Sequence, residues 1–398
     1  MYPAAMADEI RNRREPMQYR RFGKTGRELS VITLGGMRYP RQGEKPRFEV
    51  PREMLDNCID CVVRAFDAGI NHIETAWNYG KSESCYGIAL SEELKIPRDR
   101  YHLMTKGQPQ TAEDTRKMLD RQLQCLRTDH IDLYAMHGLS SRQSFQMALR
   151  PGGPVEELER QREQGVIGDI GFSTHCQDPE VLIEAIDSGR FSFMNLHYYY
   201  FWQRLAPAVA HAAAKDLGVF IISPNDKGGR LYDPLPELRA MTAPATPIQF
   251  NARWCLSDPG VHTLSFGMTA PEHFEEMRGI FPVHSPLAEA DTAIERRLQA
   301  RLDEVPHARY EGKELAGDPS GINIPEVLRL RRLWRCFGLE GFAKFRYNMF
   351  SGPEAMWYPG ELASDENIER IDASRVPQGI PLAELLRESH QGLYRPRR

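Results

Sequence analysis

Apolar, strand-like runs alternate with helix-like segments eight times along the chain. The runs occupy residues 31–37, 72–76, 102–105, 131–136, 169–173, 193–198, 219–223 and 261–266. Eight successive β-then-α units are typical of a closed parallel barrel. An open doubly wound sheet normally carries a glycine-rich motif after an early strand, and neither G-x-G-x-x-G nor G-x-x-x-x-G-K occurs in the sequence. We therefore expect an α/β chain folded as a (β/α)8 TIM barrel.

The chain is longer than such a barrel requires. A (β/α)8 barrel takes about 250 residues, whereas this chain has 398. Residues 1–16 are polar and mixed in charge, which predicts a flexible N-terminal tail without the apolar core of a signal peptide. We expect the barrel to occupy residues 17–285, beginning with a short β-hairpin. The strand pattern then stops, and residues 286–398 predict a separate, mostly helical C-terminal domain.

The overall charge and the scattered cysteines argue against several classes of function. The net charge is −4, so the sequence offers no electrostatic case for binding nucleic acid. No apolar run approaches the roughly 20 residues of a membrane span. The 7 cysteines include one C-x-x-C but no second one to complete a zinc site. We expect no metal site and a cytoplasmic location.

Three successive runs end near side chains that can carry chemistry. Glu74 and Tyr79 lie at and just beyond the end of the second run, Lys106 closes the third, and His137 closes the fourth. In a parallel barrel such strand ends converge on one face, where catalysis takes place. A tyrosine beside a lysine is a suitable proton donor, because a nearby ammonium lowers a phenol pKa whose reference value is about 10. Each of the four residues taken singly has an ordinary structural explanation, and their order along the chain favours catalysis.

This ordered set resembles the aldo-keto reductase family over residues 17–285. In that family an Asp, a Tyr, a Lys and a His reduce a carbonyl with a nicotinamide cofactor in a (β/α)8 barrel. The resemblance implies that Tyr79 is the general acid and that Lys106 lowers its pKa. It also implies that Glu74 holds Lys106 in place and that His137 hydrogen-bonds the carbonyl oxygen of the substrate. One residue departs from the family, because its aspartate is Glu74 here, with a side chain one methylene longer.

The same resemblance implies a cofactor, NADP(H) or NAD(H), bound at the ends of the strands. The implied cofactor-binding residues are Gly36, Met37, Ser173, Thr174, Asn195, Ser223, Pro224, Lys227, Gly229, Gly267, Thr269, His273 and Glu276. The family holds the nicotinamide carboxamide with a Ser-Asn pair and a Gln, which are Ser173-Thr174 and Asn195 in this chain. These side chains still form hydrogen bonds but are shorter. Lys227, Gly228 and Gly229 match a loop that covers the pyrophosphate.

The segment 267–277 predicts weak discrimination between the two cofactors. Many NADPH-using relatives bind the 2′-phosphate with a lysine and an arginine there, and these positions are Ala270 and His273 in this chain. A phosphate dianion binds best to permanent positive charge, whereas a histidine with a reference pKa near 6.5 is only partly charged at neutral pH. We expect NADPH to be favoured by less than about tenfold, more so as pH falls. Arg331 or Arg335 from the C-terminal domain is the alternative source of the missing charge.

Two fragments of the C-terminal domain resemble a bacterial subgroup of the family with a ferredoxin-like domain. In that subgroup each fragment begins with Cys-Pro and closes a cysteine run that holds an iron–sulfur cluster. Here the two positions are Asp318-Pro319 and Val376-Pro377. A cluster needs four thiolates, and Cys336 is the only cysteine of this domain. We therefore expect a degenerate ferredoxin-like domain without an iron–sulfur cluster.

The expected partner is a small-molecule carbonyl substrate, with no nucleic acid and no membrane, and the oligomeric state is left open. Two other functions stay open beside carbonyl reduction. A cofactor-binding sensor or interaction module is favoured by the shortened cofactor contacts, and a sugar or alcohol dehydrogenase would run the same chemistry in reverse. Three explanations stay open for Tyr39, His72, Trp77 and the aromatic run 197–202, namely a substrate pocket, core packing or a domain interface.

Overall fold

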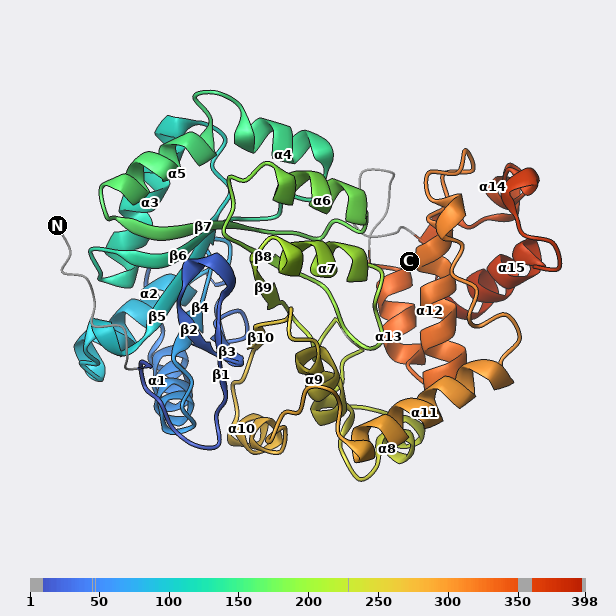
Figure 1. Ribbon diagram of the computed structural model, residues 1–398, viewed down its shortest axis with the longest axis horizontal. Coiled ribbons are helices and arrows are strands. Elements are labelled where there is room, and N and C mark those ends of the chain that lie inside the picture. The colour runs from blue at the N-terminus through green and yellow to red at the C-terminus, as the bar shows by residue number, and fades with distance from the viewer. Residues whose placement is uncertain (1–9, 45, 47, 228, 350–359, 396–398) are drawn as a thin grey trace. The chain divides into compact units, whose positions relative to one another are not determined.

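The repeated β-then-α pattern folds into a closed parallel barrel, which confirms the expected fold class (Figure 1). The computed structural model describes residues 10–44, 46, 48–227, 229–349 and 360–395. The barrel strands pair in the order β10-β3-β4-β5-β6-β7-β8-β9. Their bounds are β3 Ile32–Gly35, β4 His72–Glu74, β5 His102–Gly107, β6 Ile131–Met136, β7 Ile167–Ser173, β8 Phe193–Leu196, β9 Gly218–Ile221 and β10 Thr263–Phe266.

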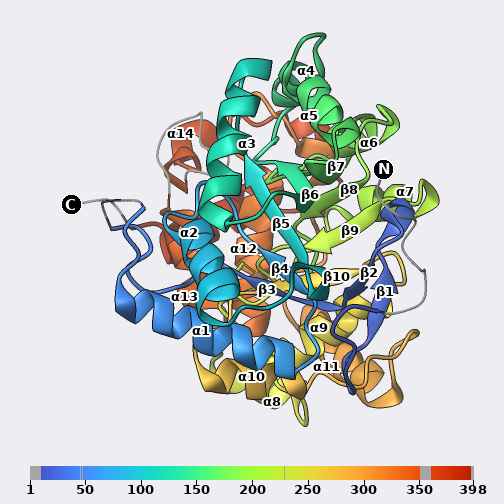
Figure 2. The ribbon, with the colours of Figure 1, turned by 90° about the vertical axis from the view of Figure 1, so that its left-hand side faces the viewer.

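Helices follow the strands along the chain and lie on the outside of the barrel (Figure 2). They are α1 Arg52–Asp67, α2 Ser82–Gly87, α3 Ala112–Leu126, α4 Arg142–Leu149, α5 Pro154–Glu163, α6 Pro179–Asp187, α7 Ala206–Ala214, α9 Pro247–Ser257 and α10 Pro271–Arg278. Helix α3 shows why these segments form helices. The Thr111 side chain accepts a hydrogen bond from the backbone amide of Asp114 and caps its first turn. Its Leu119 and Leu126 lie on one buried stripe.

A short hairpin closes the end of the barrel at which the strands begin. Strands β1 (Tyr19–Arg21) and β2 (Glu28–Ser30) pair antiparallel. Phe22 and Leu29 from this hairpin are fully buried in one cluster with Met104, Leu133, Ala135, Phe193 and Phe220 from the barrel strands. Gly23 has a φ of 52°, and a Cβ atom there would lie 2.4 Å from the backbone nitrogen of Gly218. The hairpin turn therefore requires glycine where it approaches β9.

The described part of the N-terminal segment is tied to the barrel, in contrast to the expected flexible tail. Arg11 Nη1 donates to the carbonyl of Tyr101 at 2.6 Å, and Asn12 Nδ2 donates to the carbonyl of Ile70 at 3.0 Å. Asn12 is itself buried. The sequence expectation rested on polarity alone, and these polar side chains satisfy carbonyl groups beside the starts of strands. Residues 1–9 of the expected tail lie outside the described residues.

The chain divides into two compact units, and the second one contains more than the expected C-terminal domain. The first unit runs to Pro224 and resumes at Asn251–Leu287, whereas Asn225–Phe250 belongs with the chain from Ala288 onward. Helices α8 (Pro236–Thr242) and α11 (Glu289–Glu304) contact each other, and Arg297 Nε donates to the carbonyl of Met241 at 2.9 Å. A segment that interrupts the barrel in sequence is thus part of the second unit.

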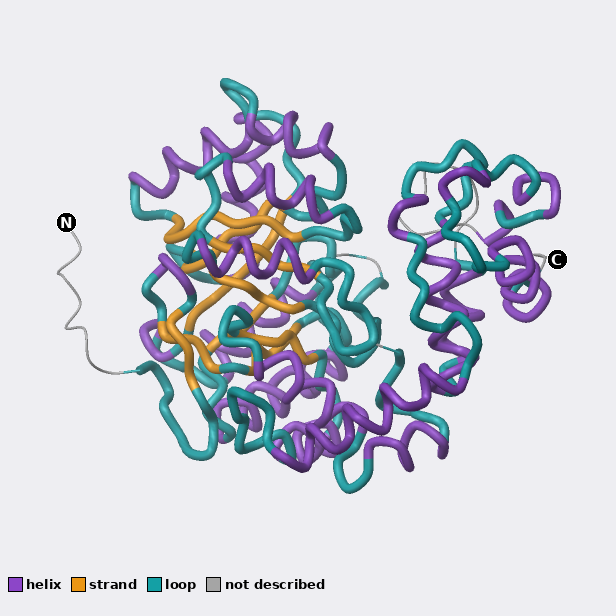
Figure 3. The backbone as a smooth tube through the Cα atoms, turned by 45° about the vertical axis from the view of Figure 1, so that its right-hand side comes forward, coloured by secondary structure: helices purple, strands orange, loops and turns teal. Residues whose placement is uncertain are grey.

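The second unit is built from helices and loops in its described part (Figure 3). Besides α8 and α11 it contains α12 Ile324–Phe337, α13 Glu340–Tyr347, α14 Asp365–Ile368 and α15 Leu382–Leu393. Helix α12 contacts α11, α13 and α15. Arg331 and Arg335, the suggested sources of charge for the cofactor, both pair with Glu388 of α15, at 2.6 and 3.2 Å. Within this unit, therefore, both arginines already have a carboxylate partner.

Asp318 stands where the resembling ferredoxin-like domains have a cysteine, and it organises the loop around it. Its Oδ1 accepts from the backbone amide of Ser320 at 2.9 Å, and its Oδ2 accepts from that of Asp372 at 3.1 Å. These bonds connect the first fragment to the segment just before the second.

No helix among the described residues combines the length and the apolarity that crossing a bilayer requires.

Candidate active site

The alternation of strand side chains brings the predicted catalytic residues to the inner face of the barrel. Met104 and Ala135 belong to the buried interior of the barrel. Lys106 lies two residues beyond Met104 on β5, and His137 lies two residues beyond Ala135 at the end of β6. Because successive strand side chains point to opposite faces, Lys106 and His137 continue the inner face at the carboxyl ends of their strands. In barrels of this kind, that end carries the active site.

Glu74 and Lys106 form a buried ion pair at this end. Glu74 is the last residue of β4 and is 2% exposed, and Lys106 on β5 is 1% exposed. The ammonium of Lys106 contacts Glu74 Oε1 directly and donates to the carbonyl of Thr75 at 2.9 Å. On the other side of the carboxylate, Ser265 Oγ on β10 donates to Glu74 Oε2 at 3.2 Å. Three strands thus hold the carboxylate and the ammonium together.

Tyr79 and His137 complete the cluster that the sequence predicted. The Tyr79 hydroxyl donates to Glu74 Oε1 at 3.4 Å, and Lys106 Nζ lies 4.8 Å from the centroid of the Tyr79 ring. The rings of Tyr79 and His137 meet edge to face, with centroids 5.8 Å apart and an interplanar angle of 88°. A phenol, an ammonium, a carboxylate and an imidazole are therefore in mutual contact range where the strands end.

The electrostatics of Tyr79 differ from the sequence expectation. Burial raises the pKa of Tyr79, and the nearby guanidinium of Arg38 opposes that rise. Burial also lowers the pKa of Lys106 well below its usual value, while the contact with the Glu74 carboxylate favours its charged form. The expected lowering of the Tyr79 pKa was wrong, because sequence reasoning counted the ammonium and could not count the loss of water. A raised pKa keeps the proton on the phenol at neutral pH.

Arg38 is a residue of this site that sequence reasoning missed. It is exposed, just beyond β3, and its charge acts on Tyr79. A Cβ atom at Gly267, beyond β10, would lie 2.7 Å from the Arg38 side chain. Arg38 thus lies beside both the phenol and one of the predicted cofactor positions. Its position directly after Gly36 and Met37 is the sequence signal that could have indicated it.

A second buried carboxylate braces the strand that carries Lys106. Glu83 on α2 is 2% exposed, and its Oε1 accepts from Thr105 Oγ1 at 2.6 Å and from Gln122 Nε2 at 2.7 Å. Gln122 Nε2 also donates to the carbonyl of Lys106 at 3.2 Å. This network fixes β5 from outside the barrel. The signal in the sequence was Gln122, a polar residue within the buried stripe of α3.

The predicted nicotinamide-binding residues lie on neighbouring strands. Ser173 ends β7, and its hydroxyl accepts from the backbone amide of Gly138 at 3.2 Å. The backbone amide of Thr174 donates to the carbonyl of Asn195 on β8 at 2.9 Å. The Asn195 side chain is fully buried, and its Oδ1 has no hydrogen-bond partner among the described residues. A buried amide oxygen without a partner is costly, so this position fits a ligand that donates a hydrogen bond, as a carboxamide does.

The predicted phosphate-binding residues are divided between the two units. Ser223 and Pro224 follow β9 in the first unit, and Ser223 has a φ of 52°, which is uncommon for a residue other than glycine. Lys227 and Gly229 belong to the second unit, where Gly229 has a φ of 139°. Gly228 of the same predicted loop lies outside the described residues. The sequence placed all of these residues within one barrel domain.

The remaining predicted cofactor residues lie beyond β3 and β10. A Cβ atom at Gly36 would lie 2.4 Å from Ser82 Oγ, and Met37 is 50% exposed. Gly267 and Thr269 follow β10, and His273 and Glu276 lie on α10. The backbone amide of Thr269 donates to His273 Nδ1 at 3.1 Å. This bond fixes the orientation of the His273 ring beside Thr269.

The aromatic run 197–202 is buried, as the core-packing alternative predicted, and it carries a polar chain. His175 Nδ1 lies 2.7 Å from His197 Nε2, and His197 Nδ1 lies 2.5 Å from the Tyr199 oxygen. Tyr199 in turn donates to the carbonyl of Ile222. This sequence of donors places the His197 proton on Nδ1 and leaves its Nε2 to accept from His175. His72 and Tyr39 are buried too, and Trp77 is half-buried.

A buried lysine–carboxylate pair beside a tyrosine and a histidine lies at the carboxyl end of the (β/α)8 barrel, and such an arrangement is chemically able to transfer a proton. The family model of the aldo/keto reductase family matches residues 31–229. Because this match spans half of the chain, the protein belongs to the aldo/keto reductase family. It is thus an oxidoreductase with the barrel of that family.

Individual relatives and solved structures agree with this family. An uncharacterized oxidoreductase of Bacillus subtilis is 28% identical over 240 residues, which cover 54% of this chain and 68% of the relative. D-Arabinose 1-dehydrogenase of Saccharomyces cerevisiae is 31% identical over 158 residues, which cover 38% of this chain and 44% of the relative. The holo form of an aldo-keto reductase from Bacillus halodurans has the same fold, with a TM-score of 0.57 at 20% identity, over 71% of this chain and 96% of that chain.

Proposed function

We propose that the protein is a nicotinamide-dependent reductase of aldehydes or ketones, with Tyr79 as the proton donor. The observation that supports this most is the contact of the Tyr79 hydroxyl and the Lys106 ammonium with the same carboxylate, Glu74. Neither the phenol nor the ammonium would be held in that position by core packing alone. The pair of groups is useful where a proton must be given to a substrate oxygen in a site with little water.

The proposed roles follow from the contacts of each residue. Tyr79 gives its proton to the carbonyl oxygen of the substrate and becomes a phenolate, which the nearby Lys106 ammonium stabilises. Glu74 keeps Lys106 charged and in place against the effect of burial. His137, whose ring packs against that of Tyr79, donates a hydrogen bond to the same carbonyl oxygen and stabilises the charge that develops there.

The cofactor, NADP(H) or NAD(H), would be held by the residues beyond the strand ends. Asn195 and the Ser173-Thr174 pair suit its carboxamide, because Asn195 Oδ1 is buried without a partner among the described residues. Ser223 and Pro224, which follow β9 in the first unit, suit its pyrophosphate. Gly36, Met37, Gly267, Thr269, His273 and Glu276 suit the rest of the molecule. When bound, the cofactor supplies the hydride, and the residues of the chain position it and move the proton.

The variant Tyr79→Phe tests this proposal. It should bind the cofactor with wild-type affinity but lose about 10²–10⁴-fold in carbonyl reduction, as expected when a general acid is removed. Tyr310→Phe, which removes a phenol hydroxyl from the second unit, is the matched control and should leave turnover unchanged. Turnover of Tyr79→Phe within about threefold of the wild type would refute the assignment of Tyr79 as the acid.

A sugar or alcohol dehydrogenase is the second candidate, favoured by the name of the yeast relative, D-arabinose 1-dehydrogenase. The same residues would then act in reverse, with Tyr79 as a phenolate accepting the proton of a hydroxyl group. Rates measured with aldehydes in one direction and with pentoses in the other would separate the two. A sensor that binds the cofactor without turnover would reduce no member of an aldehyde panel.

A further inference from the structure

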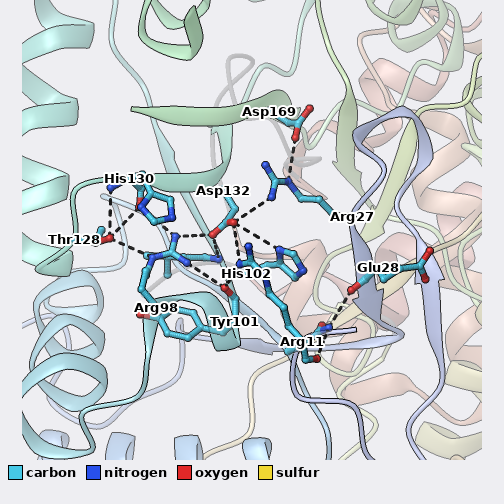
Figure 4. A network of polar contacts seen from close by, with 12 residues as sticks. Arg11, Arg27, Glu28, Arg98, Tyr101, His102, Thr128, His130, Asp132 and Asp169 are labelled. Atoms are coloured by element: carbon cyan, nitrogen blue, oxygen red, sulfur yellow. Dashed lines mark hydrogen bonds and ion pairs between the residues drawn. The ribbon is translucent and has the colours of Figure 1, made fainter. Parts of the chain in front are cut away.

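A cluster of arginines surrounds one buried carboxylate (Figure 4). It lies where β6 begins, at the opposite end of the barrel from Glu74, which ends β4. Asp132 is the second residue of β6 and is 3% exposed. Its Oδ1 accepts from Arg11 at 3.2 Å and from Arg27 at 3.1 Å, and its Oδ2 accepts from Arg98 at 2.5 Å. The backbone amide of Leu103 adds a fourth bond, at 2.9 Å. Asp132 is therefore fully satisfied, and its single charge cannot balance three guanidinium groups.

A cavity of about 310 Å³ opens beside this cluster. Ile131 and Ile167, the first residues of β6 and β7, line it together with Arg11, Arg27, Asp132 and Arg162. The side chains of Arg11 and Arg27 are 29% and 22% exposed, so both guanidinium groups retain access to a ligand. The volume lies at the lower end of the range for small-molecule sites, roughly 300–1,000 Å³. The cavity is thus large enough for a small ligand, and it lies at the end of the barrel where the strands begin.

Arg162 carries a positive charge that no ion pair among the described residues neutralises. It lies on α5 and lines the cavity, yet its side chain has no hydrogen bond and no ion pair to any residue that the structure describes. Its charge reaches Asp169 only at longer range, and Asp169 already pairs with Arg27 at 3.1 Å. Among the described residues, the arginines at positions 11, 27, 98 and 162 have two ion-pair partners, Asp132 and Asp169, which leaves two positive charges in excess.

The lack of a side chain at Gly168 leaves room for the guanidinium group of Arg27. A Cβ atom at Gly168, the second residue of β7, would lie 2.3 Å from Arg27 Nη2 and 2.4 Å from the carbonyl oxygen of Asp132. Any larger residue at this position would displace the guanidinium group from the cavity. The nearby His102 adds no charge, because burial lowers its pKa to about 4. The positive charge therefore comes from groups that stay ionised at all physiological pH values.

We propose that this cavity binds a phosphate dianion, as inorganic phosphate or as the phosphate group of a small monoester. A dianion matches the two positive charges in excess. Phosphate offers several acceptor oxygens to guanidinium forks, which bind it in a bidentate manner. Arg162 provides the donors with no other partner, and Arg11 and Arg27 provide the partly exposed ones. The site is separate from the proposed cofactor site, because it lies where the barrel strands begin.

Titration of the full-length protein with inorganic phosphate, and separately with glycerol 3-phosphate, tests this site. Binding is measured by calorimetry and by the shift of the melting temperature at constant ionic strength. Arg162→Gln removes the unused guanidinium and should weaken binding of the preferred ligand by about tenfold or more. Arg121→Gln removes an exposed arginine of α3 that does not line the cavity and is the matched control. It should bind phosphate as the wild type does.

Each possible outcome of the titration either supports the phosphate site or overturns it. Preference for glycerol 3-phosphate over inorganic phosphate would identify a monoester as the ligand, and preference for inorganic phosphate would identify the free anion. Equal binding would show that the site recognises the phosphate group alone. Arg162 is exposed and has no ion-pair partner in the described part of the chain, so its variant should melt at the wild-type temperature without phosphate. An affinity of Arg162→Gln within about threefold of the wild type would overturn the proposal, since phosphate would then bind elsewhere, for instance at the cofactor site. Absence of binding to the wild type at millimolar phosphate would overturn it as well.

Discussion

Replacement of Glu74 by glutamine should test the buried ion pair at the centre of the site most directly. Glutamine keeps the shape of the side chain, and its amide oxygen can accept from one of the Tyr79 and Ser265 hydroxyl groups while its amide nitrogen donates to the other, so it removes mainly the negative charge. Lys106 then has an ammonium that is 1% exposed and lacks its carboxylate partner. Removal of one partner from a buried ion pair typically costs about 3–5 kcal/mol. We therefore expect the free energy of unfolding of Glu74→Gln to fall by about this amount at neutral pH.

The loss should depend on pH in a defined direction. Burial lowers the pKa of Lys106 in the folded protein, and in Glu74→Gln no carboxylate opposes this effect. Between that lowered value and the unfolded value of about 10.4, the unfolded chain binds more protons than the folded one. Stability of the variant should therefore rise with pH across this window, and the deficit relative to the wild type should shrink from about pH 7 to about pH 10.

Urea denaturation at both pH values measures this deficit, and carbonyl reduction measures its consequence for catalysis. Glu74→Asp, which keeps the charge on the side chain used elsewhere in the family, is the matched control and should remain active, whereas Glu74→Ala should be badly impaired. Equal stability of Glu74→Gln and the wild type at neutral pH, or a deficit that does not change with pH, would refute the reasoning. Wild-type reduction by Glu74→Ala would show that Glu74 is only structural.

Three further measurements test other parts of the structure. Burial lowers the pKa of His102 to about 4, below its reference of about 6.5, so on acidification the unfolded chain binds a proton before the folded one does. The free energy of unfolding should therefore fall as the pH is lowered between these two values. In His102→Asn, the urea midpoint should lose the part of its pH dependence that comes from this group. Dissociation constants should favour NADPH over NADH by less than about tenfold, because Ala270 and His273 stand where many NADPH-using relatives have a lysine and an arginine. A hundredfold preference would contradict this. Protein purified anaerobically should contain neither stoichiometric iron nor sulfide, since four thiolates per cluster are lacking.

The sequence was sufficient for the barrel and for the grouping of four side chains at its carboxyl end. The alternation of runs predicted a closed parallel barrel, and in such a barrel Glu74, Lys106 and His137 are expected to meet at one face. What the pattern could not supply was burial in three dimensions. The pKa of Tyr79 rises because the phenol loses water, and this depends on which loops cover it. Arg38 was missed because its place directly after Gly36 and Met37 indicates the cofactor side of the site, whereas its proximity to Tyr79 and Gly267 depends on how the loops fold.

The sequence was also insufficient where distant segments pack together. Residues 225–250 were placed in the barrel by continuity, yet α8 packs against α11 in the second unit. The described tail was expected to be loose because it is polar, yet Arg11 bonds to Asp132, 121 positions away along the chain. A polar side chain is expected to be exposed only if no buried group of opposite charge pairs with it. A single sequence does not show which distant residue, here Asp132, supplies that charge.

The hairpin at the floor of the barrel has a consequence for the order of events during synthesis. Phe22 packs against Phe193 with ring centroids 5.5 Å apart, and the turn at Gly23 fits against Gly218. These partners leave the ribosome long after the hairpin does, and contacts of such wide sequence separation form slowly. Phe22 and Leu29 therefore remain without their native neighbours until most of the barrel has been made. The hairpin is thus translated early but is among the last segments to pack. It can cover the end of the barrel only after β9 has been synthesised.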